Sequence, residues 1–212
     1  MNAARFLFAG FVGVWLTGLC AVNGAEIDVA AGDGTLAAAL TRAKPGDVLK
    51  LAVGEYRGCV IVPEGVTVRG AGPDKTKMTG KGHTLIGIGG ARVTLAGIEL
   101  QVGEDMERGV DSDAPVRIEC CRFVKFPHGV ALRGAPLSDV IACEFKECSI
   151  GVRAIGKASP TVWGCRFDGG RLGVFDMDGA PYIRNNLFCQ LDEGIHLLGF
   201  RNDVEGQCRL AA

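Results

Sequence analysis

Residues 116–203 contain four similar segments, VRIECCRFVKFPHGVALRGAP (116–136), DVIACEFKECSIGVRAIGKASP (139–160), TVWGCRFDGGRLGVFDMDGAP (161–181) and YIRNNLFCQLDEGIHLLGFRND (182–203). One aligned position is occupied by Cys121, Cys143, Cys165 and Asn186. Two residues later, at successive steps of 22, 22 and 21 residues, stand Phe123, Phe145, Phe167 and Phe188. Each segment then reaches a glycine followed by Val or Ile. Self-similarity at this period predicts a solenoid, in which every repeat packs only on its neighbours.

The period also fits coils of parallel β-strands. A parallel strand rises about 3.3 Å per residue and its neighbours lie about 4.8 Å away, so three short strands with their turns use about one period. Because side chains alternate along a strand, Ile118 and Phe123 are expected inside, and Arg117 and Arg122 outside. Outward columns then predict ion pairs between strands, within the sets Arg117 with Asp139, and Arg122 with Glu144 and Arg166.

The rest of the chain adds a resemblance to a known fold family. A helical pattern over residues 36–43, with Thr35 as N-cap, precedes Pro45-Gly46-Asp47 and a Gly54-Glu55-Tyr56 strand, and the last segment has the form I-x-N-x-x-F…G-I-x-L. Together these resemble the right-handed parallel β-helix of the pectin-lyase-like superfamily. The resemblance implies three sheets, formed by the Gly-Val strands, the segment starts and the Phe strands, with the helix capping the N-terminal end. We therefore expect an all-β, right-handed parallel β-helix of about seven coils of ~22 residues.

The N-terminus has the features of a secretory signal. Arg5 precedes an apolar run over residues 6–19, and the small residues Gly24 and Ala25 follow. We expect a signal peptide over 1–25, an uncleaved anchor and a lipid anchor at Cys20 being the alternatives. The β-helix domain then covers 26–212: cap and first irregular coils (26–92), regular coils (93–203) and an uncapped tail (204–212). The protein is expected to be secreted, periplasmic or at the cell surface, with no membrane span after signal removal.

The net charge limits the binding partners that can be expected, and the positions of the cysteines indicate their redox state. The net charge of −1 argues against a nucleic-acid partner held by phosphate contacts. Because Cys121, Cys143 and Cys165 share one repeat position, we expect them to be buried and reduced. The sequence leaves open the pairing of the other cysteines, which are Cys59, Cys120, Cys148, Cys189 and Cys208.

The resemblance implies that functional residues stand outward on the Gly-Val strands. Two outward columns result there, one with Asp111, Ala131, Arg153, Phe175 and His196, the next with Asp113, Arg133, Ile155, Met177 and Leu198. Asp111 and Asp113 share parity, so both could face one Ca²⁺. Arg133 and Arg153 could hold a uronate carboxylate, with His196 at the far end. An acidic pair with a basic residue would supply metal-assisted β-elimination, as in pectate lyases.

Other candidates are weaker. Trp163, Tyr182 and Arg184 could stack on a sugar ring or form a local cation–π contact. Asp176 and Asp178 are assigned to a turn beside Gly179. The motifs of the superfamily's hydrolases, esterases and epimerases are absent.

The leading functional hypothesis is an exported module that binds acidic polysaccharide or serves as a scaffold, without an evident catalytic set. A pectate-lyase-like polysaccharide lyase acting on uronate polymers is the first alternative. A periplasmic β-helix protein for metal-enzyme maturation is the second, from residues 194–197 and the following Asn202. A missing C-terminal cap further predicts either end-to-end self-association through the last coil or fraying after Asn202.

Overall fold

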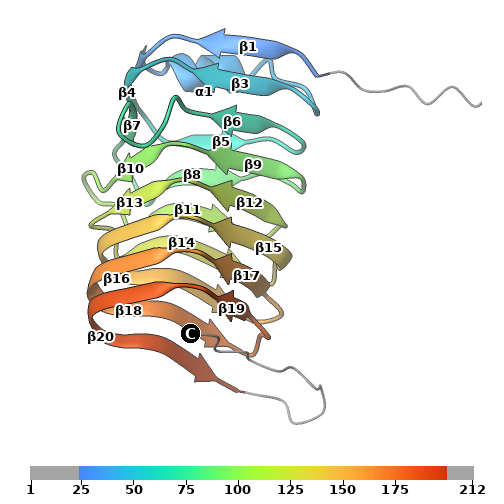
Figure 1. The fold of residues 1–212 in the computed structure, drawn as a ribbon. Helices are drawn as coiled ribbons and strands as arrows, with labels where there is room; N and C mark the ends of the chain where they lie inside the picture. The colour runs from blue at the N-terminus through green and yellow to red at the C-terminus, as the bar shows by residue number, and fades with distance from the viewer. Residues whose placement is uncertain (1–23, 200–212) are drawn as a thin grey trace, which may run out of the picture.

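The chain forms a stack of parallel coils (Figure 1). Its structure, a computed structural model, describes residues 24–199. One sheet runs the length of the stack and contributes one strand to each coil, eight in the described part. Its strands, in spatial order, are β1 (Glu26–Val29), β3 (Val48–Leu51), β6 (Thr67–Arg69), β9 (Val93–Ala96), β12 (Val116–Glu119), β15 (Pro136–Ile141), β17 (Ser159–Trp163) and β19 (Tyr182–Arg184). We call this sheet the second face; its existence confirms the predicted parallel β-helix.

The other two faces are separate in the first coils and joined in the last three. The first face consists of β5 (Val60–Val62), β8 (Thr84–Ile88), β11 (Arg108–Ser112), β14 (His128–Arg133) and the C-terminal halves of three long strands. The third face consists of β2 (Gly32–Asp33), β4 (Gly54–Arg57), β7 (Thr76–Thr79), β10 (Glu99–Gln101), β13 (Arg122–Val124) and the N-terminal halves of the same long strands. These long strands are β16 (Glu144–Ile155), β18 (Arg166–Met177) and β20 (Leu187–Leu198).

The expectation of three separate sheets is therefore corrected for the C-terminal coils. At the corner of each long strand a residue has a left-handed backbone: Glu147 (φ 52°), Gly169 (φ 71°) and Gln190 (φ 53°). One such residue bends a strand while the pairing on both sides continues, so two faces join into one hydrogen-bonded sheet.

A phenylalanine ladder fills the core, as the repeat predicts. Neighbouring rings of Phe123, Phe145, Phe167 and Phe188 are stacked with centroids 4.9, 4.7 and 5.0 Å apart. The repeated glycines make room for these rings. A Cβ placed on Gly151 would lie 2.5 Å from the ring of Phe167, so only glycine fits there.

A second ladder consists of thiols. Cys121, Cys143 and Cys165 are free and at most 2% exposed, which confirms their predicted burial. Their thiols lie within hydrogen-bond distance of backbone carbonyls, for example Cys165 Sγ 3.4 Å from Val140 O. In the last coil Asn186 takes this position, where it accepts from the Cys165 N–H and donates to Val162 O, both at 2.8 Å.

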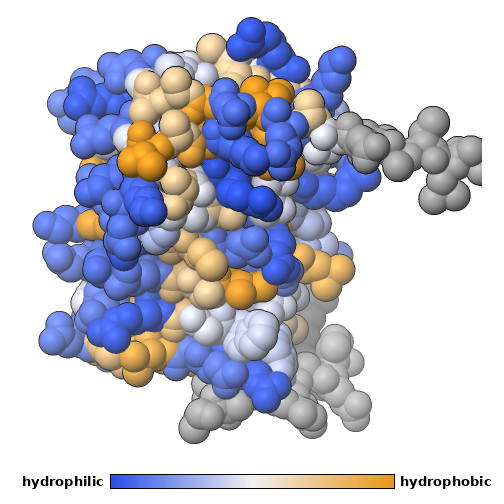
Figure 2. Space-filling view, turned by 45° about the horizontal axis from the view of Figure 1, so that its top comes forward, coloured by the Kyte–Doolittle hydropathy of each residue, from blue (hydrophilic) through white to orange (hydrophobic). Residues whose placement is uncertain are grey.

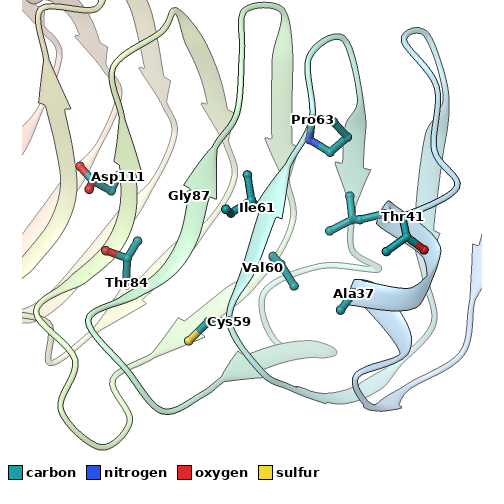
Figure 3. Close-up of a pocket in the computed structure, with 10 residues that line it drawn as sticks. Ala37, Thr41, Cys59, Val60, Ile61, Pro63, Thr84, Gly87 and Asp111 are labelled. Carbon is teal, nitrogen blue, oxygen red and sulfur yellow. The ribbon is translucent and has the colours of Figure 1, made fainter.

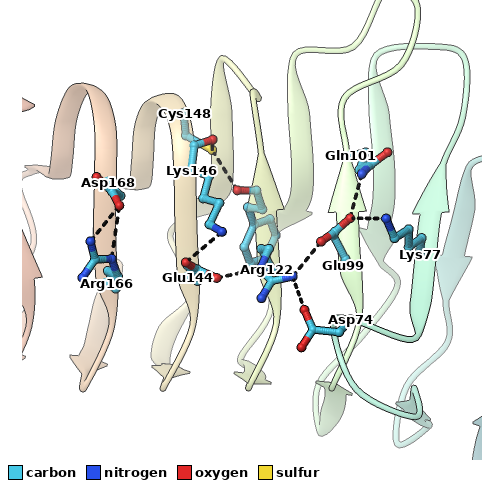
Figure 4. Close-up of polar contacts among 11 residues, drawn as sticks. Asp74, Lys77, Glu99, Gln101, Arg122, Glu144, Lys146, Cys148, Arg166 and Asp168 are labelled. Atoms are coloured by element: carbon cyan, nitrogen blue, oxygen red, sulfur yellow. Dashed lines mark hydrogen bonds and ion pairs between the residues drawn. The ribbon is translucent and has the colours of Figure 1, made fainter. Parts of the chain in front are cut away.

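The third face carries an ion-pair network around Arg122 (Figure 4). Arg122 contacts Glu99 at 2.8 Å, Asp74 at 2.7 Å and Glu144 at 2.6 Å. These carboxylates, Glu99 first, raise the pKa of the guanidinium. The predicted column of Arg122, Glu144 and Arg166 is confirmed in register, but Arg166 turns away to Asp168, at 2.8 Å. The predicted pair of Arg117 with Asp139 is present at 3.2 Å.

Helix α1 (Thr35–Leu40) lies at the N-terminal end of the stack against β1, β2 and β5 (Figure 1). The expected span of 36–43 is corrected at both ends. Gly34, in the left-handed conformation, is the N-cap, and Thr35 is already helical. The helix ends at Leu40 with Thr41 as C-cap, and the chain continues in tighter turns, in which Arg42 N–H donates to Ala39 O and Ala43 N–H to Leu40 O.

The surface is mixed in character. Figure 2 shows apolar patches separated by hydrophilic residues on the side that it presents. No helix in the described part of the chain combines the length and apolar character that a membrane span requires. The predicted signal peptide (apart from Gly24 and Ala25), the tail over 204–212, Cys20 and Cys208 lie outside the described residues.

Candidate functional site

Strand register brings the predicted first-face residues into one line. Asp111 pairs with Ala131, Ala131 with Arg153, Arg153 with Phe175, and Phe175 with His196. The same line extends toward the N-terminal end through Gly87 and Ile61. In the neighbouring column, register joins Arg133, Ile155, Met177 and Leu198.

Arg133 lies between the two carboxylates that were predicted to hold Ca²⁺. Its guanidinium is 3.1 Å from Asp111 Oδ2 and 2.9 Å from Asp113 Oδ1. The hydrogen bond to Asp113 raises the pKa of Arg133. Arg108 adds a second contact to Asp111 Oδ2, at 3.5 Å. The donor set therefore suits a guanidinium better than a metal ion, because a positive charge already stands between the carboxylates. The charge of Arg133, which was predicted to act with Arg153, is thus compensated by these carboxylates.

Two other arginines meet at the C-terminal end of the first face. Arg153 and Arg171 line a depression of about 310 Å³ together with Phe175, Glu193 and His196. Neither arginine forms an ion pair with any residue of the range 24–199. His196 Nδ1 lies 2.9 Å from the carboxylate of Glu193, and its ring stacks on Phe175 with centroids 5.7 Å apart. We call this group the cationic depression.

Sequence reasoning missed Arg171, Glu193 and His128. Arg171 and Glu193 follow corner residues, whose effect on side-chain direction the repeat pattern does not give. His128 pairs in register with Arg108 and is half-buried, with Nδ1 lacking a hydrogen-bond partner among the described residues. Burial first, and then the nearby charges of Arg153 and Arg108, lower the pKa of His128. His128 is thus biased toward its neutral form beside two cations.

An apolar groove opens at the N-terminal end of the same face (Figure 3). It has a volume of about 700 Å³ and lies between α1 and strands β5, β8 and β11. Its lining residues are Ala37, Leu40, Thr41, Cys59, Val60, Ile61, Pro63, Thr84, Gly87 and Asp111. We call this the apolar groove. The repeat could not reveal it, since one wall comes from a helix outside the repeat.

The aromatic candidates lie on another face. Trp163 and Tyr182 belong to the second face and are 48% and 40% exposed. Arg184 pairs in register with Trp163, and its NH1 donates to the Tyr182 hydroxyl at 3.4 Å. These residues therefore form a cluster of their own, apart from the first-face line.

Metal-ligating side chains do not converge in the described structure. Within residues 24–199 no group of three His, Cys, Asp or Glu side chains could hold a metal ion. His83 contacts Glu107 at 3.0 Å, at some distance along the stack from the His196–Glu193 pair. The hypothesis of metal-enzyme maturation gains no support from this part of the chain.

Solved structures match the chain in fold. A PL6 family alginate lyase, AlyGC, superposes with a TM-score of 0.59 and 14% identity, over 82% of this chain and 39% of that one. A point mutant of the same lyase gives a TM-score of 0.59 and 15% identity, over 85% of this chain and 38% of that one. The chain thus spans less than half the length of the lyase it matches. It matches no protein-family model and no curated protein.

These matches and the observed strand topology agree on architecture. The chain has the right-handed parallel β-helix fold, with its charged candidate residues on the first face and its aromatic candidates on the second.

Proposed function

We propose that the protein is an exported β-helix module that binds an acidic polysaccharide along its first face. The observation that supports this proposal is the contrast between its arginines. Arg133 is neutralised by Asp111 and Asp113, whereas Arg153 and Arg171 line the cationic depression without ion-pair partners in residues 24–199. A guanidinium donates two parallel N–H groups to one carboxylate, which suits the repeated carboxylates of a uronate polymer.

The surroundings of the two arginines fit a sugar. Arg153 and Arg171 stand on the neighbouring strands β16 and β18 and line one depression, although Arg171 is offset along the strands from Phe175, the register partner of Arg153. Phe175 offers a ring surface beside them, and Glu193 and His196 offer hydrogen-bonding groups for hydroxyls. The depression is open to solvent, so a polymer could cross it without threading.

Binding to short uronate oligomers tests the proposal. Calorimetry with galacturonate, mannuronate and guluronate hexamers should find at least one ligand whose affinity falls as salt rises, because the contacts are ionic. Changing both Arg153→Ala and Arg171→Ala should weaken binding by at least about 100-fold, because it removes two charge-assisted contacts that are each worth about 1.5–3 kcal/mol.

The matched control removes two charges elsewhere. Arg69→Ala with Lys75→Ala takes the same charge from exposed side chains away from the first face. This control should bind as the unchanged protein does. Equal affinity of the Arg153/Arg171 double variant and the control would refute the proposal. Arg133→Ala should weaken binding less than the Arg153/Arg171 double variant does, because the charge of Arg133 is already compensated by Asp111 and Asp113.

β-Elimination on the same face is the second candidate function, favoured by the Glu193–His196 contact. With Nδ1 held by Glu193, His196 Nε2 could take the proton at C5 of a uronate. Arg153 would neutralise the adjacent carboxylate as the C4–C5 double bond forms and the C4–O bond breaks, the leaving oxygen taking a proton from solvent. The new double bond absorbs in the ultraviolet. Loss of this ultraviolet signal in His196→Ala would support His196 as the base. Loss in Asp111→Ala, together with a requirement for Ca²⁺, would instead support the metal-assisted reaction predicted from the sequence.

A further inference from the structure

We propose that the apolar groove binds an uncharged sugar residue of the same polysaccharide whose acidic residues contact Arg153 and Arg171. The inference rests on the proposed function and deepens it, because it makes the ligand a polymer with both charged and neutral residues. Three features of the groove support it: its floor, its charge and its position.

The floor is flat and apolar. Ile61 is 71% exposed although it is a large aliphatic side chain on a strand of the first face. Its register partner Gly87, on the neighbouring strand in Figure 3, adds no side chain above the sheet. Pyranose rings carry C–H groups on their faces, and burying such a face against aliphatic side chains is favourable. The exposed Ile61 thus gains a partner when a sugar lies on it.

The charge of the groove excludes an acidic sugar. No Lys, Arg or His is among its lining residues, and the one charged residue is Asp111, at its edge. Asp111 is already paired with Arg133 and Arg108, so a uronate carboxylate here would lose its hydration without meeting an unpaired cation. The hydroxyls of Thr41 and Thr84 can pair with the hydroxyls of a neutral sugar instead.

The position of the groove makes it part of the same binding line. Ile61, Gly87, Asp111, Ala131 and Arg153 are successive members of one register column. Four strand spacings of about 4.8 Å separate Ile61 from Arg153, or roughly 19 Å, a span that a short oligosaccharide covers. Between the two ends the column carries Asp111, whose side chain is 13% exposed and paired with Arg133, and the small, buried Ala131.

Cys59 provides a direct readout, because this exposed thiol lines the groove. Cys120 is the matched control, an exposed thiol on a turn between the second and third faces. The probes are uronate trimers and their carboxyl-reduced counterparts, which keep the same linkage but are neutral. At about ten times its Kd the neutral trimer should slow alkylation of Cys59 about tenfold, since only the free protein reacts, and leave Cys120 unchanged. The acidic trimer should not protect Cys59.

Two variants separate this inference from the proposed function. Gly87→Leu fills the groove; a Cβ at Gly87 makes an ordinary contact of 3.5 Å with Ile61, so the strand can accept it. Ile61→Ala removes the exposed floor without touching the core. Both should abolish protection by the neutral trimer and keep acidic-trimer binding through Arg153 and Arg171.

The outcomes are distinct. Protection of Cys59 by the acidic trimer as well as the neutral one, or by neither, overturns the inference while acidic binding still stands. Loss of acidic-trimer binding in the unchanged protein overturns the proposed function instead.

Discussion

Two buried carboxylic acids show how hydrogen bonding decides the behaviour of single residues in this fold. Asp47 is 7% exposed and accepts hydrogen bonds from the N–H groups of Lys44 and Ala25, both at 2.8 Å, which lower its pKa. Asp176 is 1% exposed; its Oδ2 accepts from Gly179 N–H at 3.1 Å, but its Oδ1 has no partner among the described residues. Burial raises the pKa of Asp176 to about 6. Asp47 is therefore a stabilising turn residue and Asp176 a source of instability at neutral pH.

Asp176→Asn should stabilise the protein in a pH-dependent way. The folded-state pKa of about 6 lies above the usual value of about 3.9, so the carboxyl favours folding below pH ~4, and this contribution is lost as pH rises through 6. A difference of about two pKa units corresponds to at most about 3 kcal/mol in the free energy of unfolding. The gain in the free energy of unfolding, measured by urea titration, should be near zero at pH 4 and largest at pH 7 to 8. A constant gain across this range would mean that Asp176 does not titrate as described.

Asp176 also marks a limit of sequence reasoning at this scale. The Asp-x-Asp pattern beside Gly179 favoured a turn, which holds for Asp178, with its left-handed backbone, but Asp176 belongs to β18 and points inward. The outward columns were predictable, because side chains alternate between inward and outward along a strand and the repeat sets the strands in register. The Arg133–Asp113 pair lies within one such column, but the contact of Arg133 with Asp111 was not predictable, because a long side chain can turn to a neighbouring column.

At the scale of elements, the phenylalanine ladder makes each coil depend on the next. Phe145 is 1% exposed and stacks on Phe123 and Phe167, whereas the Phe188 ring stacks only on Phe167 among the described residues. Phe145→Ala should therefore lower the free energy of unfolding by about 3–5 kcal/mol, and Phe188→Ala by less. Thermal and urea unfolding of the two variants measures the difference. Equal losses would show that the stack on both sides of Phe145 adds nothing.

The thiol ladder allows a chemical test. Burial raises the pKa of Cys121 to about 12, and this thiol has 1% of its surface exposed. Because Cys121, Cys143 and Cys165 are all buried, they should resist alkylation in the native protein and react after unfolding without reductant, whereas the exposed Cys59 and Cys120 should react in the native state. Peptide mapping that places any ladder cysteine in a disulfide would disprove this account.

The elements themselves were predictable to the extent that they repeat. The regular period of Phe123 and its equivalents fixes parallel strands in register, since stacking like on like leaves one alignment. The joining of two faces was not predictable, because Glu147 and Gln190 are not residues that signal a left-handed corner. The apolar groove likewise depends on how α1 packs on β5, which no repeat encodes.

At the scale of the whole molecule, the first face changes from apolar at its N-terminal end to cationic at its C-terminal end. The first face has an apolar groove near α1, a compensated Asp111–Arg133–Asp113 group in the middle and the cationic depression near β20. A net charge of −1 hides this division. A linear ligand laid along the stack would therefore meet different chemistry at each end, and its direction of binding would be fixed by its sequence of charged and neutral sugars.

The end of the stack at β20 gives a last prediction. In a solenoid each coil is stabilised only by its neighbours, and β20 pairs with β18 alone in the described structure. Amide hydrogens of β20 should exchange faster than those of β16, which is paired on both sides. If coils associate end to end through this edge, as the sequence led us to expect, protection of β20 should rise with protein concentration while that of β16 stays constant. Asp192 and Glu193, both exposed, oppose such stacking by charge, so Asp192→Asn should strengthen it. Concentration-independent protection of β20 equal to that of β16, in a protein shown to be monomeric by sedimentation, would exclude both an exposed edge and self-association.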